Sequence, residues 1–151
     1  MDQIALSKLQ QYCAYSERCH SEVRSKLLRL EIYGDKLEEI ISSLIQDDFL
    51  NEERYARSYV SGKYRMNQWG KIKIIMNLKA KRVTEYCINK GLEEIDPEEY
   101  FNNLVHLIEK QKRIYSRKSL NDYQMNSKLY QFAYGKGYES EIIKMALEEI
   151  S

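Results

Sequence analysis

Apolar residues recur every three or four positions along almost the whole chain, which is the period of an amphipathic α-helix. Clear stripes of this kind occupy residues 23–30 and 37–45. The 151 residues include only six glycines and one proline, the residues that punctuate the turns of many-stranded sheets. We therefore expect an all-α protein.

Several residues mark predicted helix ends. Asn51, Thr84 and Asp96, which a proline follows, can accept hydrogen bonds from the first amides of a helix. Asp35 is placed to do the same for an earlier helix. Gly34 suits the left-handed conformation that ends a helix, so we expect it to end the one before.

The predicted helices form three sets of three, repeating about every 50 residues, a period typical of modular units that stack on one another. The pairs assigned to equivalent places in the second helix of each set are Val23 with Leu27, Ile72 with Met76, and Met125 with Leu129. The predicted units are residues 1–50, 51–95 and 96–151. Each has the size of a helix-turn-helix module, and together they would form an elongated, curved chain. The alternative is one irregular helical bundle.

Several classes of protein do not fit this sequence. No apolar stretch is long enough to cross a bilayer, and the first residues lack a secretory signal. Three cysteines without tight spacing indicate reduced thiols and a cytoplasmic protein. The familiar catalytic, phosphate-loop and metal-binding motifs are absent, so we expect neither an enzyme nor a cofactor or metal. Nothing in the pattern indicates oligomers, and we expect a monomer.

The net charge of +1 conceals a strong segregation of charge along the chain. Residues 31–53 carry eight acidic side chains and one lysine, whereas residues 54–82 contain no acidic residue. One interpretation is a solvated face balanced by acidic neighbours. The interpretation we favour is a surface for phosphates or an acidic protein. The predicted partner- or DNA-binding residues are Arg54, Arg57, Lys63, Arg65, Trp69, Lys71, Lys73, Lys79, Lys81 and Arg82.

Three segments resemble the RecX family of bacterial recombination regulators. Residues 48–56, Asp-Phe-Leu-Asn-Glu-Glu-Arg-Tyr-Ala, are similar to its Gly-(Tyr/Phe)-(Leu/Ile)-(Asn/Asp)-(Asp/Glu)-Glu-Arg-(Phe/Tyr)-Ala stretch, with Asp48 in place of glycine. Residues 18–27 resemble the family's Arg-Ser-Glu-x-Glu-Leu-x-x-Lys-Leu, and residues 69–74 its Gly-x-x-(Arg/Lys)-Ile turn. Asp tolerates a positive φ less readily than Gly, so the turn at Asp48 could differ.

The resemblance implies an interaction protein without a cofactor. Members of the family bind the RecA recombinase filament and inhibit its ATPase and strand-exchange activities in recombination and DNA repair, and some contact DNA. By this resemblance Tyr55 and Ala56 hold the second unit together. Arg54 and Arg57 either pair with the acidic first unit or face the partner. The alternative function is a helix-turn-helix protein that binds single- or double-stranded DNA without a recombinase.

Overall fold

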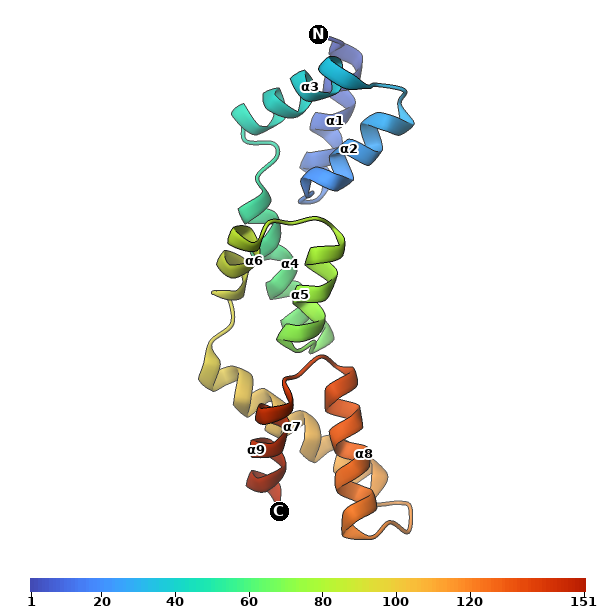
Figure 1. Cartoon of the computed structure of the whole chain (residues 1–151), viewed down its shortest axis with the longest axis vertical. Helices are drawn as coiled ribbons and strands as arrows, with labels where there is room; N and C mark the ends of the chain where they lie inside the picture. The colour runs from blue at the N-terminus through green and yellow to red at the C-terminus, as the bar shows by residue number, and fades with distance from the viewer. The chain divides into compact units, whose positions relative to one another are not determined.

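The computed structural model describes all residues, 1–151, and contains nine α-helices and no strand, which confirms the all-α prediction (Figure 1). None of the helices has the length and apolar character that a membrane crossing requires. The helices are α1 (Gln3–Tyr15), α2 (His20–Arg29), α3 (Gly34–Gln46), α4 (Glu52–Asn67), α5 (Lys71–Ala80), α6 (Glu85–Leu92), α7 (Pro97–Tyr115), α8 (Asp122–Gly135) and α9 (Ser140–Ile150).

Three predicted helix starts are confirmed by their hydrogen bonds. Asn51 Oδ1 accepts from the Arg54 amide at 3.0 Å, and Asp96 Oδ2 accepts from the Glu99 amide at 2.8 Å. Thr84 caps α6 in the same way, at 3.3 Å. These acceptors satisfy amides that have no partner within the helix.

The predicted start at Asp35 is wrong. Helix α3 begins at Gly34, after Tyr33, which makes no side-chain cap, and Asp35 lies inside the first turn. A carboxylate there still interacts favourably with the positive end of the helix. Gly34 does adopt a positive φ of 58°, but it begins α3 and does not end α2.

Helices α2, α3 and α5 each end through a non-glycine residue in the left-handed conformation: Glu31, Asp48 and Arg82 have φ between 61° and 63°. In each case the next amide bonds back to a carbonyl five residues earlier, as from Phe49 to Leu44 at 2.8 Å. Asp48 therefore adopts the backbone conformation that the family's glycine favours.

The first helix of each set buries the same pattern of positions, i, i+4 and i+8, so its core residues follow one another along one face. The buried residues are Ala5, Leu9 and Cys13 in α1, Ala56, Val60 and Tyr64 in α4, and Tyr100, Leu104 and Ile108 in α7. The third helices share another pattern, three and six residues after their first position: Leu37 and Ile40, Ile88 and Gly91, and Ile143 and Ala146.

In the second helices, the equivalence assigned to Ile72 and Met76 is wrong. Those side chains are 39% and 65% exposed, whereas Ile74 and Leu78 are fully buried. Ile74 and Leu78 lie three and seven residues after the start of α5, as Val23 and Leu27 do in α2. Apolar residues occupy five of the first eight positions of α5, so periodicity alone does not select its buried face.

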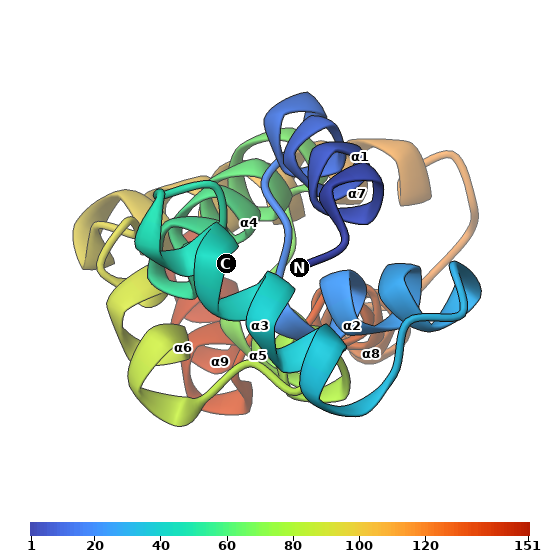
Figure 2. The ribbon, with the colours of Figure 1, turned by 90° about the horizontal axis from the view of Figure 1, so that it is seen from above.

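By its internal contacts the chain forms two compact units. One comprises residues 1–61 and 77–93, the other residues 62–76 and 94–151. In the first, α3 packs on both α1 and α2; in the second, α7, α8 and α9 all contact one another (Figures 1 and 2). The three-helix boundaries at 1–50, 51–95 and 96–151 remain a prediction.

Candidate functional site

The turn between α4 and α5 lies against the connection between α8 and α9. The Gly70 amide donates to the Lys136 carbonyl at 2.8 Å, and the Ile72 amide donates to the Gly137 carbonyl at 2.9 Å. The Tyr138 hydroxyl donates to the Gln68 carbonyl at 3.0 Å. These bonds fix the backbone on both sides of Trp69, a half-buried residue.

Three buried tyrosines lie beneath this turn. The Tyr100 ring is 6.0 Å from the Tyr64 ring and 5.1 Å from the Tyr138 ring, measured between centroids. The Tyr100 hydroxyl accepts from the Lys71 amide at 2.9 Å and donates to Glu139 Oε1 at 2.5 Å. Burial raises the pKa of Tyr64 to about 12, and it also raises the pKa of Tyr100 and Tyr138. The phenols are therefore neutral hydrogen-bonding groups at physiological pH.

Two lysines from different helices lie over the Trp69 ring. The ammonium group of Lys63, on α4, is 4.9 Å from the indole centroid, and that of Lys73, on α5, is 4.6 Å from it. Lys71 is similarly 4.9 Å from the Tyr100 ring. Cations at these distances are attracted by the ring face. We call Lys63, Trp69 and Lys73 the Trp69 cluster.

The two arginines of the family motif are paired with acidic side chains. Arg54 Nε is 2.5 Å from Glu17 Oε2, and Arg54 Nη1 is 3.1 Å from Asp48 Oδ1. Arg57 contacts Glu53 at 3.3 Å and Glu93 at 3.0 Å. The neighbouring carboxylates raise the pKa of both guanidinium groups. Arg54 thus pairs with acidic residues of the predicted first unit. Arg57 does not: its partners, Glu53 and Glu93, lie outside residues 1–50.

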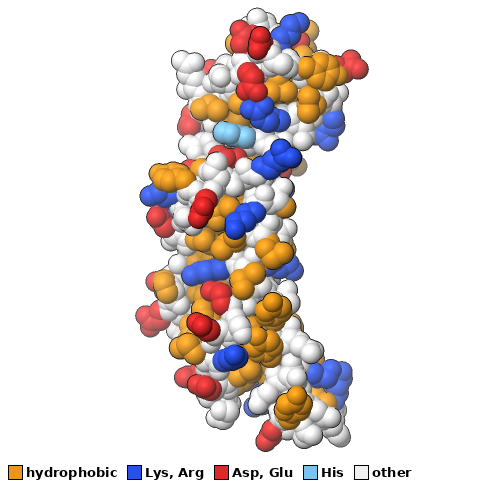
Figure 3. Space-filling model, viewed as in Figure 1, with side chains coloured by type: hydrophobic (Ala, Val, Ile, Leu, Met, Phe, Trp, Pro, Cys, Tyr) orange, Lys and Arg blue, Asp and Glu red, His pale blue; other side chains and the backbone are white.

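The remaining predicted residues do not share one environment. Arg65 pairs with Glu99 at 3.4 Å, and Lys81 pairs with Glu22 at 3.7 Å. Lys79 is exposed and forms no salt bridge, whereas Arg82 occupies the left-handed position after α5. On the face drawn in Figure 3, blue basic and red acidic side chains are interspersed, and no large patch of one charge stands out. Of the ten predicted residues, the structure brings together the three of the Trp69 cluster.

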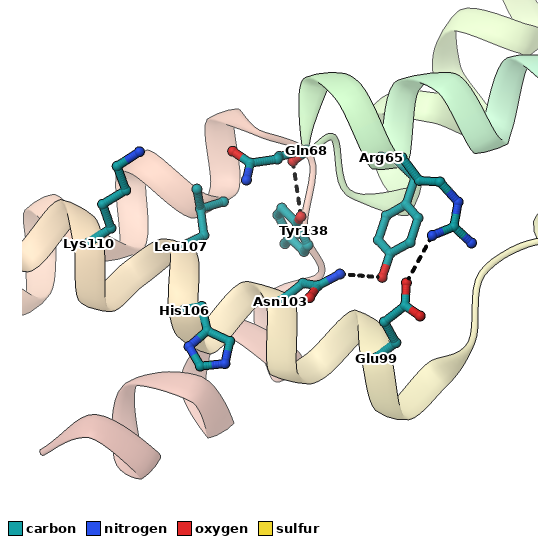
Figure 4. Close-up of a pocket in the computed structure, with 9 residues that line it drawn as sticks. Arg65, Gln68, Glu99, Asn103, His106, Leu107, Lys110 and Tyr138 are labelled. Atoms are coloured by element: carbon teal, nitrogen blue, oxygen red, sulfur yellow. Dashed lines mark hydrogen bonds and ion pairs between the residues drawn. The ribbon is translucent and has the colours of Figure 1, made fainter.

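A pocket of about 410 Å³ opens between the end of α4 and α7 (Figure 4). Asn103 Nδ2 donates to the Tyr64 hydroxyl at 2.8 Å, and the Arg65–Glu99 ion pair lies beside it. Lys110 adds a second cation at the rim. Such a pocket could accept an anionic or amide side chain of a partner protein.

Sequence reasoning missed the residues that support this site: Tyr100, Asn103, Tyr138 and Glu139. Tyr100 and Tyr138 belong to ordinary apolar patterns, and Asn103 and Glu139 are part of no motif. The closely spaced Gly135 and Gly137 were the one available signal, since Gly137 has a φ of 98°. No group of three or more His, Cys, Asp or Glu side chains is arranged to hold a metal ion.

Comparison with known proteins identifies the family. Residues 51–92 match the model of the second three-helix domain of RecX, and residues 98–147 match that of the third. The chain belongs to the RecX family. Among its RecX relatives, the regulatory protein RecX of Bacillus mycoides strain KBAB4 is 33% identical over 139 residues, and that of Bacillus cytotoxicus is 34% identical. The alignments cover 92% of this chain and 51% of each relative, so the chain spans about half the length of these relatives.

Solved RecX structures have the same fold. The crystal structure of RecX from Lactobacillus salivarius superimposes with a TM-score of 0.87 at 28% sequence identity, covering 96% of this chain and 93% of that one. A crystal structure of another regulatory protein RecX gives a TM-score of 0.84 at 24% identity, covering 95% and 70%. The all-helical architecture is therefore that of RecX proteins.

Proposed function

We propose that this protein binds the filament of a RecA-type recombinase in the cytoplasm and inhibits its ATPase and strand-exchange activities. Membership of the RecX family and the regulatory role named for its relatives support a protein partner. The observation that carries the proposal is the Trp69 cluster, in which two lysines from different helices flank one indole.

The chemistry of this cluster suits a protein–nucleic acid filament. Tryptophan buries a large apolar area at an interface and is among the residues that dominate binding energy. Lysines around it provide the positive charge that attracts acidic side chains or phosphates. The docked backbone at Gly70 holds the indole before a partner arrives, so little conformational entropy is lost on binding.

The test is a recombinase ATPase assay on single-stranded DNA with this chain added. Reversing the charge of Lys63 and Lys73 together, K63E with K73E, is expected to weaken inhibition at least tenfold. Lys144→Glu, an exposed lysine of α9, is the matched control and should leave inhibition unchanged. Circular dichroism establishes that each variant keeps its helical content. Unchanged inhibition by the double variant would remove the Trp69 cluster from the proposal.

Binding to naked DNA distinguishes this function from that of a protein that acts on DNA without a recombinase. A protein acting on DNA alone should bind naked strands tightly, and its affinity should fall steeply with salt concentration. A filament regulator should inhibit the assembled recombinase at concentrations at which it leaves naked DNA largely unbound. Tight naked-DNA binding without any effect on the ATPase would favour the helix-turn-helix alternative.

A further inference from the structure

Helices α1 and α2 carry a second surface on which cations and aromatic rings alternate. It is a shallow groove of about 360 Å³ between α1, the α1–α2 connection and α2. Three of its six lining residues are basic and none is acidic. We call it the Tyr12 groove, and its lining residues are Lys8, Gln11, Tyr12, Tyr15, Arg18 and Lys26.

Arg18 lies in this groove, and part of its guanidinium group can still donate hydrogen bonds to a ligand. Its guanidinium carbon is 3.7 Å from the centroid of the Tyr12 ring, and its Nε donates to the Tyr12 carbonyl at 3.0 Å. The adjacent carboxylate, Glu17, bonds instead to Arg54, and Arg18 forms no salt bridge. The terminal nitrogens of Arg18 therefore retain donors in the planar fork that matches a phosphate.

Two further cations and an open ring surround this guanidinium. The Lys26 ammonium group is 5.6 Å from the Tyr12 ring, and Lys8 is exposed on α1. Tyr15 is 87% exposed, and its ring centroid is 6.0 Å from the Arg18 guanidinium carbon. An aromatic ring this exposed has a face free to stack on another planar group.

We propose that the Tyr12 groove binds a single-stranded nucleic acid, with phosphates on Arg18, Lys8 and Lys26 and a base stacked on Tyr15. Single strands expose both phosphates and unstacked bases, and aromatic side chains interleaved with cations recognise that combination. A duplex offers phosphates but keeps its bases stacked, and an acidic peptide offers charge without planar bases. The groove has partners for both chemical groups.

This proposal goes beyond the recombinase contact, because it concerns the first unit and not the Trp69 cluster. It predicts that the full chain binds a fluorescein-labelled oligothymidylate in an anisotropy titration at low salt, at concentrations well above those that inhibit the assembled recombinase. Tyr15→Ala should weaken binding at least about fivefold, the lower end of the effect of stacking one base on a ring. Lys8→Glu should weaken binding and make the slope of log affinity against log salt shallower by about 0.7.

Two matched controls lie in the same unit. Tyr33→Ala removes another exposed tyrosine, and Lys36→Glu reverses another exposed lysine; neither residue lines the groove. Both should bind oligothymidylate as the unaltered chain does. Because Lys8 and Tyr15 are exposed, their replacement should leave the helical circular dichroism spectrum unchanged.

Three outcomes would overturn the assignment. The first is unchanged oligothymidylate affinity in Tyr15→Ala. The second is an equal loss of duplex and single-strand binding in that variant, which would mean that no base stacks on the ring. The third is displacement of oligothymidylate by polyglutamate at equal charge concentration, which would make the groove a site for acidic protein segments.

Discussion

The backbone of Gly70 packs directly on the backbone of Gly137. A Cβ atom on Gly70 would lie 2.4 Å from the Gly137 carbonyl carbon, and a Cβ atom on Gly137 would lie 2.3 Å from the Lys73 Cβ. Real Cβ atoms do not approach other heavy atoms so closely. The α4–α5 turn and the α8–α9 connection can therefore meet only because both residues lack side chains.

Gly70→Ala should lower the free energy of unfolding by about 1–3 kcal/mol, because the added methyl group forces two backbone segments apart. Urea titration followed by circular dichroism and by the fluorescence of Trp69, the sole tryptophan, measures this loss. Gly62→Ala is the control: nothing lies within 4 Å of its added Cβ, and Ala favours a helix over Gly. An equal loss in both variants would contradict the close approach.

The corrected core register of α5 predicts a difference between two isoleucines. Ile74→Ala should lower the free energy of unfolding by about 2–5 kcal/mol, because it leaves a cavity at a fully buried position. Ile72→Ala should cost less than about 1 kcal/mol, since that side chain is 39% exposed. Denaturant unfolding of the two variants measures both effects. A larger loss for Ile72→Ala would contradict this register and favour Ile72 and Met76 as the core positions.

The ion pair between Arg54 and Glu17 is expected to contribute modestly to stability. Arg54→Ala should cost about 1 kcal/mol, because both side chains are partly exposed and solvent weakens their attraction. The loss should exceed that of Arg24→Ala, whose pair with Glu38 is more exposed. Parallel thermal and urea unfolding of both variants tests the order; the reverse order would count against a structural role for Arg54.

The three free cysteines should differ in reactivity. Burial raises the pKa of Cys13 and Cys19, so little thiolate forms there, and both side chains are shielded from solvent. Cys87 is only half-buried. In a thiol titration with a chromogenic disulfide at neutral pH, we expect one fast equivalent and two that react on unfolding. Cys87→Ser should abolish the fast phase, and a fast phase that persists would refute the assignment.

The buried tyrosines predict a loss of stability in alkali. Burial raises the pKa of Tyr64 to about 12, whereas a tyrosine in the unfolded chain titrates near about 10. The unfolded state thus releases protons first, so stability is full below about pH 10 and falls as the pH rises toward 12. Urea unfolding across this range measures the slope. Tyr64→Phe should make it shallower by up to about 1.4 kcal/mol per pH unit, and an unchanged slope would exclude Tyr64 as a contributor.

Much of the local structure could be predicted from the sequence. The side chains of Asn51, Thr84 and Asp96 each accept a hydrogen bond from the amide three residues later, so these caps depend on local sequence. The apolar period predicts where the helices occur. The register of α5 failed because adjacent isoleucines supply two possible stripes. The left-handed end of α2 at Glu31 carries no glycine, so its turn chemistry gives no signal in the sequence.

The candidate site was harder to predict, because a segment without acidic residues can still be neutralised by acidic residues from distant parts of the sequence. Residues 54–82 contain no acidic residue, yet Arg54 meets Glu17 of the α1–α2 connection, and Lys81 meets Glu22 of α2. Only tertiary packing reveals such partners. Lys63 and Lys73 meet at Trp69 for the same reason: they are ten positions apart in sequence, and the turn at Gly70 brings their helices together.

The ion pairs that join residues 1–50 to later helices limit how freely three-helix units can be exchanged between relatives. A chimera that replaced residues 1–50 would remove Glu17 and Glu22 together, leaving Arg54 and Lys81 without counter-ions. It would also remove Ser21, whose hydroxyl donates to the Lys81 carbonyl at 2.7 Å. A chimera should therefore take Glu17, Ser21 and Glu22 from the same parent protein as Arg54 and Lys81.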